Sequence, residues 1–368
     1  MKSKVTLGFP QMNKEKAEKR VFLPEFVQRL SRFAEVYIEE GYGGQSGFNF
    51  DDFQQGNQHV HKASRLEAFQ KDFVVVLRSP SEDDFKLLKP GACLISMLHF
   101  PTRPRRIELL KELHINAISM DSIVDDNNMR LMENMRAVAW TGLEAGFDIL
   151  EKEIPDLLHE GQPYRVVIMG TGMVGKHAVE AATKLGSMER NNRHMALNGP
   201  GSIAMSIGRN FSTCAEQVEM LFHQTDVLVD ATARRDPSVP AVPNAWLAWL
   251  PKHAVIVDLA VDPYLLDHTP PTVRGVEGIP QGNLDKYTFM PDDPEWDAGI
   301  PPSIPSQNRR AVATCYSWPG IHPDACMLHY GRQLEPLMEV LLTRPFDSLT
   351  IDGDYFARAL ARAKLPEE

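Results

Sequence analysis

Several charged and polar side chains stand at the ends of apolar runs in this chain. Five side chains occupy such positions: Arg78, His99, Asp121, Thr232 and Asp262. A sixth candidate, Arg20, follows the first apolar run after a polar loop. Ligands of open α/β sheets bind beyond the carboxyl ends of the strands. An arginine can hold a carboxylate through paired hydrogen bonds, and a histidine can exchange a proton near neutral pH. The set therefore suits an amino-acid or keto-acid substrate, although each residue could also be an ordinary surface charge or turn cap.

The glycine-rich stretch over residues 164–182 carries a second chemical signal. Its apolar run 165–169 is followed by Gly170-x-Gly172-x-x-Gly175 and then by apolar residues at helical spacing. This order of strand, glycine turn and helix is the fingerprint of dinucleotide-binding proteins, although a purely structural turn remains an alternative. Backbone N–H groups at the start of the helix would hold the pyrophosphate. The candidate cofactor-binding residues of the turn are Gly170, Thr171, Gly172, Met173, Val174 and Gly175.

Alternating apolar and helical segments indicate the elements that must position these groups. Strands are predicted at residues 5–9, 36–38, 72–78, 92–99, 115–120, 165–169, 226–232 and 254–262. A long helix is predicted over residues 129–154, between the two groups of strands. Strands that alternate with helices indicate parallel sheets, so we expect an α/β fold.

The composition is that of an ordinary globular protein. The 368 residues are 43% hydrophobic and 24% charged, with a net charge of −10. Such an acidic chain is a poor general binder of nucleic acids, and no apolar run approaches the ~20 residues that span a bilayer. The N-terminus lacks the apolar core of a signal peptide, and Cys315, His322 and Cys326 do not have zinc-site spacing. We expect a cytoplasmic protein with no metal, no nucleic-acid partner and no membrane anchor.

Several stretches match one family pattern when they are taken together. They are Leu7-Gly-Phe-Pro10, Arg20-Val-Phe-Leu-Pro24, Glu40-Gly-Tyr-Gly-Gly44, the run from Lys89 to His99, Met120-Asp-Ser122, the Gly170 turn, and Val257-Asp-Leu-Ala-Val-Asp262. With these stretches the chain resembles the family of alanine dehydrogenases and nicotinamide-nucleotide transhydrogenases, whose relatives include saccharopine dehydrogenase and carboxyethylornithine synthase.

The resemblance implies a fold of two Rossmann-like domains with parallel sheets, joined by long helices and separated by a cleft. Residues 1–134 together with 308–368 would form the substrate and catalytic domain. Residues 135–307 would form the NAD(P)-binding domain. The resemblance also implies a homo-oligomer.

The resemblance assigns roles to four of the six candidate residues. By position, Arg20 matches the family's substrate-carboxylate arginine, His99 its catalytic histidine and Asp262 its catalytic aspartate near the nicotinamide. Arg78 stands where alanine dehydrogenases have a lysine that contacts the substrate. The planar guanidinium keeps the charge but does not readily act as a base.

Two further departures bear on the substrate. Gly299 replaces a functional asparagine of the alanine dehydrogenases, and an insertion lies around residues 316–324. The favoured reaction is hydride transfer between an amino-acid α-carbon and NAD(P), with release or capture of ammonia. One alternative is opine-type or saccharopine-type condensation of an amine with a keto acid. Another is a nucleotide-binding protein without turnover.

The choice between NADP and NAD depends on the second strand of the nucleotide domain. An acidic residue that binds the adenosine ribose usually ends this strand, about 20 residues beyond the turn. Here the next strand candidate, residues 202–208, is followed by Arg209 and Asn210. An arginine suits a 2′-phosphate, so NADP is slightly favoured, with Thr232 completing the predicted cofactor site. The alternative is that residues 202–208 form the third strand and the second is irregular.

Overall fold

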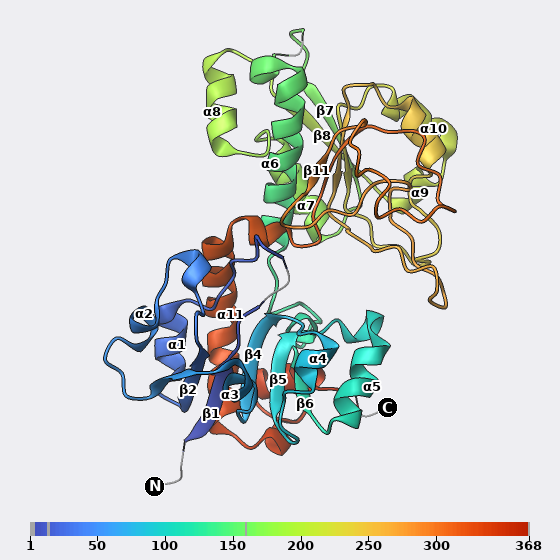
Figure 1. The fold of residues 1–368 in the computed structure, drawn as a ribbon. Helices are drawn as coiled ribbons and strands as arrows, with labels where there is room; N and C mark the ends of the chain where they lie inside the picture. Colours follow the sequence, from blue (N-terminus) through green and yellow to red (C-terminus); the bar gives the residue numbers. More distant parts are fainter. Residues whose placement is uncertain (1–3, 13–14, 159, 367–368) are drawn as a thin grey trace. The chain divides into compact units, whose positions relative to one another are not determined.

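The computed structural model describes residues 4–12, 15–158 and 160–366, which form two compact units with one six-stranded sheet each (Figure 1). The first unit comprises residues 1–14, 18–134 and 322–368, and the second comprises residues 15–17 and 135–321. The second unit is therefore inserted into the first. None of the described helices combines the length and the apolar character needed to cross a membrane.

The sheet of the first unit is entirely parallel and has the strand order β3-β2-β1-β4-β5-β6. Its strands are β1 (Val5–Phe9), β2 (Ala34–Glu39), β3 (Val60–Ala63), β4 (Phe73–Arg78), β5 (Cys93–Met97) and β6 (Asn116–Ser119). This is the 3-2-1-4-5-6 order of doubly wound folds. Because all strands run the same way, the residues that follow β4, β5 and β6 share one edge of the sheet.

Helices from both ends of the chain complete the first unit. They are α1 (Pro24–Leu30), α2 (Phe50–Gln54), α3 (Arg65–Phe69), α4 (Glu82–Phe85), α5 (Pro104–Glu112), α11 (Pro323–Thr343) and α12 (Tyr355–Arg362). Side-chain caps from Asn49, Ser64 and Ser81 start α2, α3 and α4. Beyond α12, the N–H of Leu365 donates to the carbonyl of Ala117 at 2.9 Å, so the C-terminal segment covers the edge strand β6.

The sheet of the second unit has the order β11-β12-β10-β9-β7-β8. Its strands are β7 (Tyr164–Met169), β8 (Ser202–Ile207), β9 (Val227–Asp230), β10 (Val255–Asp258), β11 (Thr288–Phe289) and β12 (Ala311–Thr314). All pairs are parallel except β11 with β12. β8 pairs directly with β7, so residues 202–207 form the second strand of the nucleotide-type fold and the third-strand alternative is wrong.

The helices of the second unit are α6 (Met135–Glu153), α7 (Met173–Ala182), α8 (Met188–Ala196), α9 (Arg209–Ser212) and α10 (Ala215–Phe222). α6 begins six residues later than expected, because Val124 and Arg130 instead form a bridge in an irregular segment. The two-sheet α/β fold predicted from the sequence is confirmed. The expected boundary at residue 307 differs from the structure, because β12 is hydrogen-bonded inside the second sheet and the unit continues through Ile321.

Candidate functional site

Glu18 joins two of the predicted substrate arginines in the first unit. Its carboxylate accepts hydrogen bonds from Nε and Nη2 of Arg20 at 2.8 and 2.6 Å, and from Nη1 of Arg78 at 3.0 Å. Burial raises the pKa of Glu18, but the hydrogen bonds from both guanidinium groups outweigh it and hold that pKa below its ordinary value. The three side chains therefore form one hydrogen-bonded cluster.

A small hollow opens beside this cluster. Its walls are Gln11 and Met12, residues 18–21, and the glycine-rich loop with Gly43, Gln45 and Ser46. Met12 is also tied to the cluster, because its Sδ accepts the backbone N–H of Arg78 at 3.3 Å. The hollow has a volume of about 10 Å³, which is room for about one water molecule beside the paired side chains of Glu18 and Arg20.

His99 is held by a buried aspartate at the same edge. Its Nδ1 lies 3.3 Å from Oδ2 of Asp121, and its backbone N–H donates to Oδ1 of Asp121 at 3.1 Å. Ser119 donates to the same carboxylate at 2.8 Å. Burial raises the pKa of Asp121. The hydrogen bonds from His99 and Ser119 lower it by more than burial raises it, so the pKa is about 2. Although Nδ1 lies beside this carboxylate, 56% of the His99 side chain remains exposed.

The glycine turn of the second unit has one open position. Gly170 has a φ of 120°, and a Cβ there would lie 2.2 Å from the carbonyl oxygen of Ala231. A Cβ at Gly175 would lie 2.2 Å from the carbonyl oxygen of Gly170. A Cβ at Gly172 would have no atom within 4 Å, and no side chain caps the start of α7. Close packing of the chain therefore requires the first and third glycines. The space at Gly172, next to the uncapped backbone N–H groups at the start of α7, is where a pyrophosphate could bind.

Two strand ends lie beside this turn. After β8, the exposed guanidinium of Arg209 donates to the carbonyl of Ala233 at 2.9 Å, and Asn210 is the next residue of α9. After β9, the backbone N–H and hydroxyl of Thr232 donate to Oδ1 of Asp230 at 3.0 and 2.7 Å. The structure therefore brings the predicted cofactor residues of three strand ends together within the second unit.

Asp262 is held by an arginine that sequence reasoning missed. The Nη2 of Arg234 lies 2.7 Å from Oδ2 of Asp262, and the Arg234 side chain is only 8% exposed. Arg234 also donates to the carbonyls of Pro237 and Val239, which fixes the loop after β9. The residue before Asp262, Val261, has a φ of 53°, a left-handed conformation that a β-branched residue seldom adopts. Strain of this kind is common where a functional group must be aimed.

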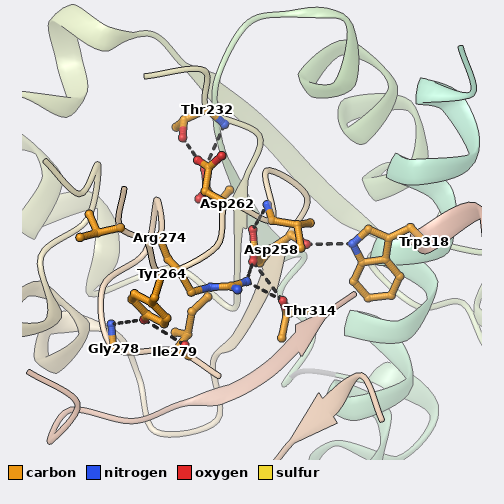
Figure 2. A network of polar contacts seen from close by, with 12 residues as sticks. Thr232, Asp258, Asp262, Tyr264, Arg274, Gly278, Ile279, Thr314 and Trp318 are labelled. Atoms are coloured by element: carbon orange, nitrogen blue, oxygen red, sulfur yellow. Dashed lines mark hydrogen bonds and ion pairs between the residues drawn. The ribbon is translucent and has the colours of Figure 1, made fainter. Parts of the chain in front are cut away.

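A buried polar network lies below Asp262 (Figure 2). Arg274 donates to the carboxylate of Asp258 and, at 2.8 Å, to the hydroxyl of Thr314. The ring of Tyr264 lies 6.0 Å from the guanidinium, and Nε1 of Trp318 donates to the carbonyl of Asp258 at 2.8 Å. The network connects β10, β12 and the irregular segments that carry Arg274 and Trp318 through hydrogen bonds.

Three residues of the candidate site were not singled out from the sequence: Glu18, Arg234 and Arg274. Glu18 stands two residues before Arg20 in a charged stretch, where its pairing leaves no periodic signal. Arg274 lies in a segment for which no helix or strand was predicted, yet it is fully buried. Asp121 was noted as a strand-end residue, but its role in holding His99 was not predicted.

Two Rossmann-like units, the second of which carries a dinucleotide-type glycine turn, define the class of this protein. Residues 11–139 match the family model described as the alanine dehydrogenase/PNT N-terminal domain. The resemblance inferred from the sequence is thereby confirmed.

Individual relatives agree with this assignment. The alanine dehydrogenase of Methanococcus maripaludis is 22% identical over 70% of this chain and 72% of its own length. That of Bacillus subtilis is 25% identical over 49% of this chain and 50% of its own. A solved structure named L-alanine dehydrogenase superposes with a TM-score of 0.71 at 22% identity, covering 98% of this chain and 94% of that one.

Proposed function

We propose that this protein is a nicotinamide-nucleotide-dependent oxidoreductase that acts on the CH–NH2 or CH–NH group of an amino acid. The observation that carries the proposal is the open position at Gly172, before the uncapped start of α7. The named alanine dehydrogenases among the relatives support the reaction class. The proposal includes the cytoplasmic homo-oligomer expected from the sequence.

The residues of the second unit would hold the cofactor. A bound nicotinamide nucleotide would supply the hydride acceptor or donor. Backbone N–H groups of residues 172–175 would bind its pyrophosphate, since the start of a helix attracts anions. Arg209, which follows β8, would contact a 2′-phosphate of NADP.

The chain's own side chains would handle the substrate. Arg20 and Arg78 would hold a carboxylate of the substrate through charge-assisted hydrogen bonds. Asp121 would hold Nδ1 of His99 so that Nε2 exchanges a proton during addition or loss of water at the substrate imine. Asp262 would offer negative charge to the substrate nitrogen as positive charge develops there.

The finer form of the proposal is an alanine-dehydrogenase-like reaction that releases or captures ammonia. Condensation of a keto acid with a second amino acid is the alternative, favoured by Arg78 in place of a lysine and by Gly299. Among the described residues, a Cβ at Gly299 would meet no atom within 4 Å. The position where alanine dehydrogenases carry an asparagine is therefore open in this chain.

A substrate panel tests the proposal. Oxidation of NADPH or NADH would be followed with small keto acids, each offered with ammonia and separately with amino acids as the amine. Turnover with ammonia supports the amino-acid dehydrogenase, and turnover only with an amino acid supports the condensing enzyme. Cofactor binding in calorimetry without any turnover would indicate a nucleotide-binding protein that lacks activity.

A further inference from the structure

A row of residues crosses the second sheet at the carboxyl ends of its strands. Met169 of β7, Asp230 of β9, Asp258 of β10 and Thr314 of β12 are neighbours in register. The two aspartates are adjacent in this row and are only 1% and 2% exposed. Two carboxylates this close in an apolar setting cannot both stay ionised without a cation to balance them.

Only one of the two aspartates receives a cation. Arg274 donates to the carboxylate of Asp258 and to Thr314. The next residue, Gly275, faces Asp230, and a Cβ at this glycine would lie 2.0 Å from Oδ2 of Asp230. The loop that covers the row therefore places a guanidinium over one carboxylate and a residue without a side chain over the other.

The other arginine near the two aspartates, Arg234, does not pair with Asp230 either. Arg234 pairs with Asp262, and Asp230 receives only the N–H and hydroxyl of Thr232, both on Oδ1. Its buried Oδ2 has no hydrogen-bond partner in the described part of the chain. Three carboxylates thus share two guanidinium groups, and Asp230 is the one without a cation.

The charged groups around Asp230 come from each neighbouring element. They are Asp258 of β10, Asp262 of the loop after β10, Arg234 and Arg209 near the loop after β9, and Arg274 of the covering loop. The glycine turn, residues 169–175, contains no ionisable side chain. Burial and the charge of Asp258 raise the pKa of Asp230 to about 7, against the lowering effect of Thr232.

The two residues that follow Asp230 lie against the turn proposed to hold the pyrophosphate. The carbonyl oxygen of Ala231 is 2.2 Å, and the backbone nitrogen of Thr232 3.2 Å, from the position of a Cβ on Gly170. Ala231 also donates its N–H to the carbonyl of Met169, the residue before that glycine. An ionised Asp230 would therefore add negative charge directly behind an anion-binding turn.

We propose that Asp230 is a proton-binding residue that couples dinucleotide binding to proton uptake. The dinucleotide brings a negatively charged pyrophosphate to the turn, so it binds more tightly when Asp230 is protonated, and its binding draws a proton onto Oδ2. The proposal rests on the dinucleotide site of the proposed function. It extends that function by making cofactor affinity depend on pH through one residue whose chain neighbours, Ala231 and Thr232, contact the turn.

Calorimetry with NADPH and NADH in buffers of different ionisation enthalpy tests the proposal. Between about pH 6 and about pH 8 the parent should take up part of a proton per cofactor. Its affinity should fall as pH rises, by at most about tenfold per pH unit because one group is involved. Asp230→Asn, which keeps the shape and removes the titration, should bind without proton uptake and with a flatter pH dependence. Asp236→Asn, a change of an exposed carboxylate in the following loop, should behave like the parent.

The outcomes separate the coupling from the dinucleotide site itself. If neither cofactor binds the parent, the dinucleotide site and the coupling are both wrong. If a cofactor binds the parent without proton uptake, or if Asp230→Asn takes up the same fraction of a proton, the coupling alone is wrong. An infrared difference spectrum of the parent with and without cofactor needs no variant. It should show a gain of protonated carboxyl on binding, and its absence would overturn the proposal.

Discussion

The Nδ1 atom of His99 lies 3.3 Å from Oδ2 of Asp121. His99 follows β5 and Asp121 follows β6, so this contact links the ends of two adjacent strands. The backbone of His99 is left-handed, with a φ of 51°, and its own N–H also donates to this carboxylate. Asp121 therefore sets both the position of the backbone and the orientation of the ring. This pairing leads to two of the five predictions that follow.

Replacing His99 should remove turnover and leave the fold intact. His99→Asn is the suitable variant, because asparagine tolerates the left-handed backbone. Loss of a general acid–base group should lower turnover by about 10²–10⁴-fold with little change in cofactor affinity. His114→Asn provides a matched control, since His114 has a φ of 55° in the same unit. Single-turnover hydride transfer and melting curves would be measured together, and normal chemistry in a folded His99→Asn protein would exclude the residue from the mechanism.

Asp121 should contribute stability that disappears in acid. Its pKa is about 2 in the folded protein and about 3.9 in an unfolded chain, so folding is favoured above pH ~4 by about 2 kcal/mol. This contribution should be lost as pH falls from about 4 to about 2. In urea unfolding, Asp121→Asn should be less stable than the parent near neutral pH, and the difference should narrow in that window. A difference that does not vary with pH would contradict the assignment.

Gly172→Val should abolish cofactor binding without harming the fold. The φ at Gly172 is −73° and a Cβ there meets no atom, so valine fits the protein but occupies the proposed phosphate position. Gly175→Val is the contrasting variant, because its Cβ would collide with the carbonyl of Gly170 and should lower the melting temperature. Calorimetry with NADPH and NADH gives the affinities. Unchanged affinity in the folded Gly172→Val protein would remove the turn from the cofactor site.

Arg209→Ala should reduce any preference for NADP over NAD. A charge-assisted contact to the 2′-phosphate contributes roughly 1.5–3 kcal/mol, which corresponds to about 10- to 150-fold in affinity. The effect should be confined to NADP, so the affinity for NAD in the same variant is the internal control. A parent that prefers NAD, or an equal loss for both cofactors, would show that Arg209 does not read the phosphate.

Asp262→Asn should lower turnover strongly while leaving cofactor binding nearly intact. The substitution keeps the shape of the side chain and removes the charge that would stabilise a positive substrate nitrogen. Asp262 is 39% exposed, so the melting temperature should change little. Asp262→Glu, which restores the charge, should recover part of the activity. Equal turnover of the asparagine variant and the parent would leave Asp262 with only a structural role beside Arg234.

The strand-end groups could be predicted because parallel strands impose a simple rule. A buried strand reads as an apolar run, and the polar residue after it must lie at the carboxyl edge of the sheet. This rule located Arg78, His99, Asp121, Thr232 and Asp262. It missed β3, since Val60–Ala63 contains a histidine and a lysine among only four residues. It also overlooked α4 (Glu82–Phe85), which depends on the capping box of Ser81 rather than on apolar periodicity.

The partners of these groups could not be predicted from local pattern. Glu18 reaches Arg78 across 60 residues of chain, and Arg234 reaches Asp262 across 28. Such pairs follow from how loops return over a sheet, which leaves no periodic trace in the sequence. Strand register also matters, because Asp230 and Asp258 each end an apolar run and only the pairing of β9 with β10 places them side by side.

The insertion of the second unit into the first has a consequence for the order of folding. During synthesis the chain emerges from its N-terminus, so residues 135–321 can form their complete unit while the first unit still lacks α11 and α12. Until then, the apolar surface that Leu334 and Met338 will cover stays open, and β6 has no neighbour on its outer side. A released chain that ends after Ile321 should therefore resist proteases over its second unit and be cut within its first.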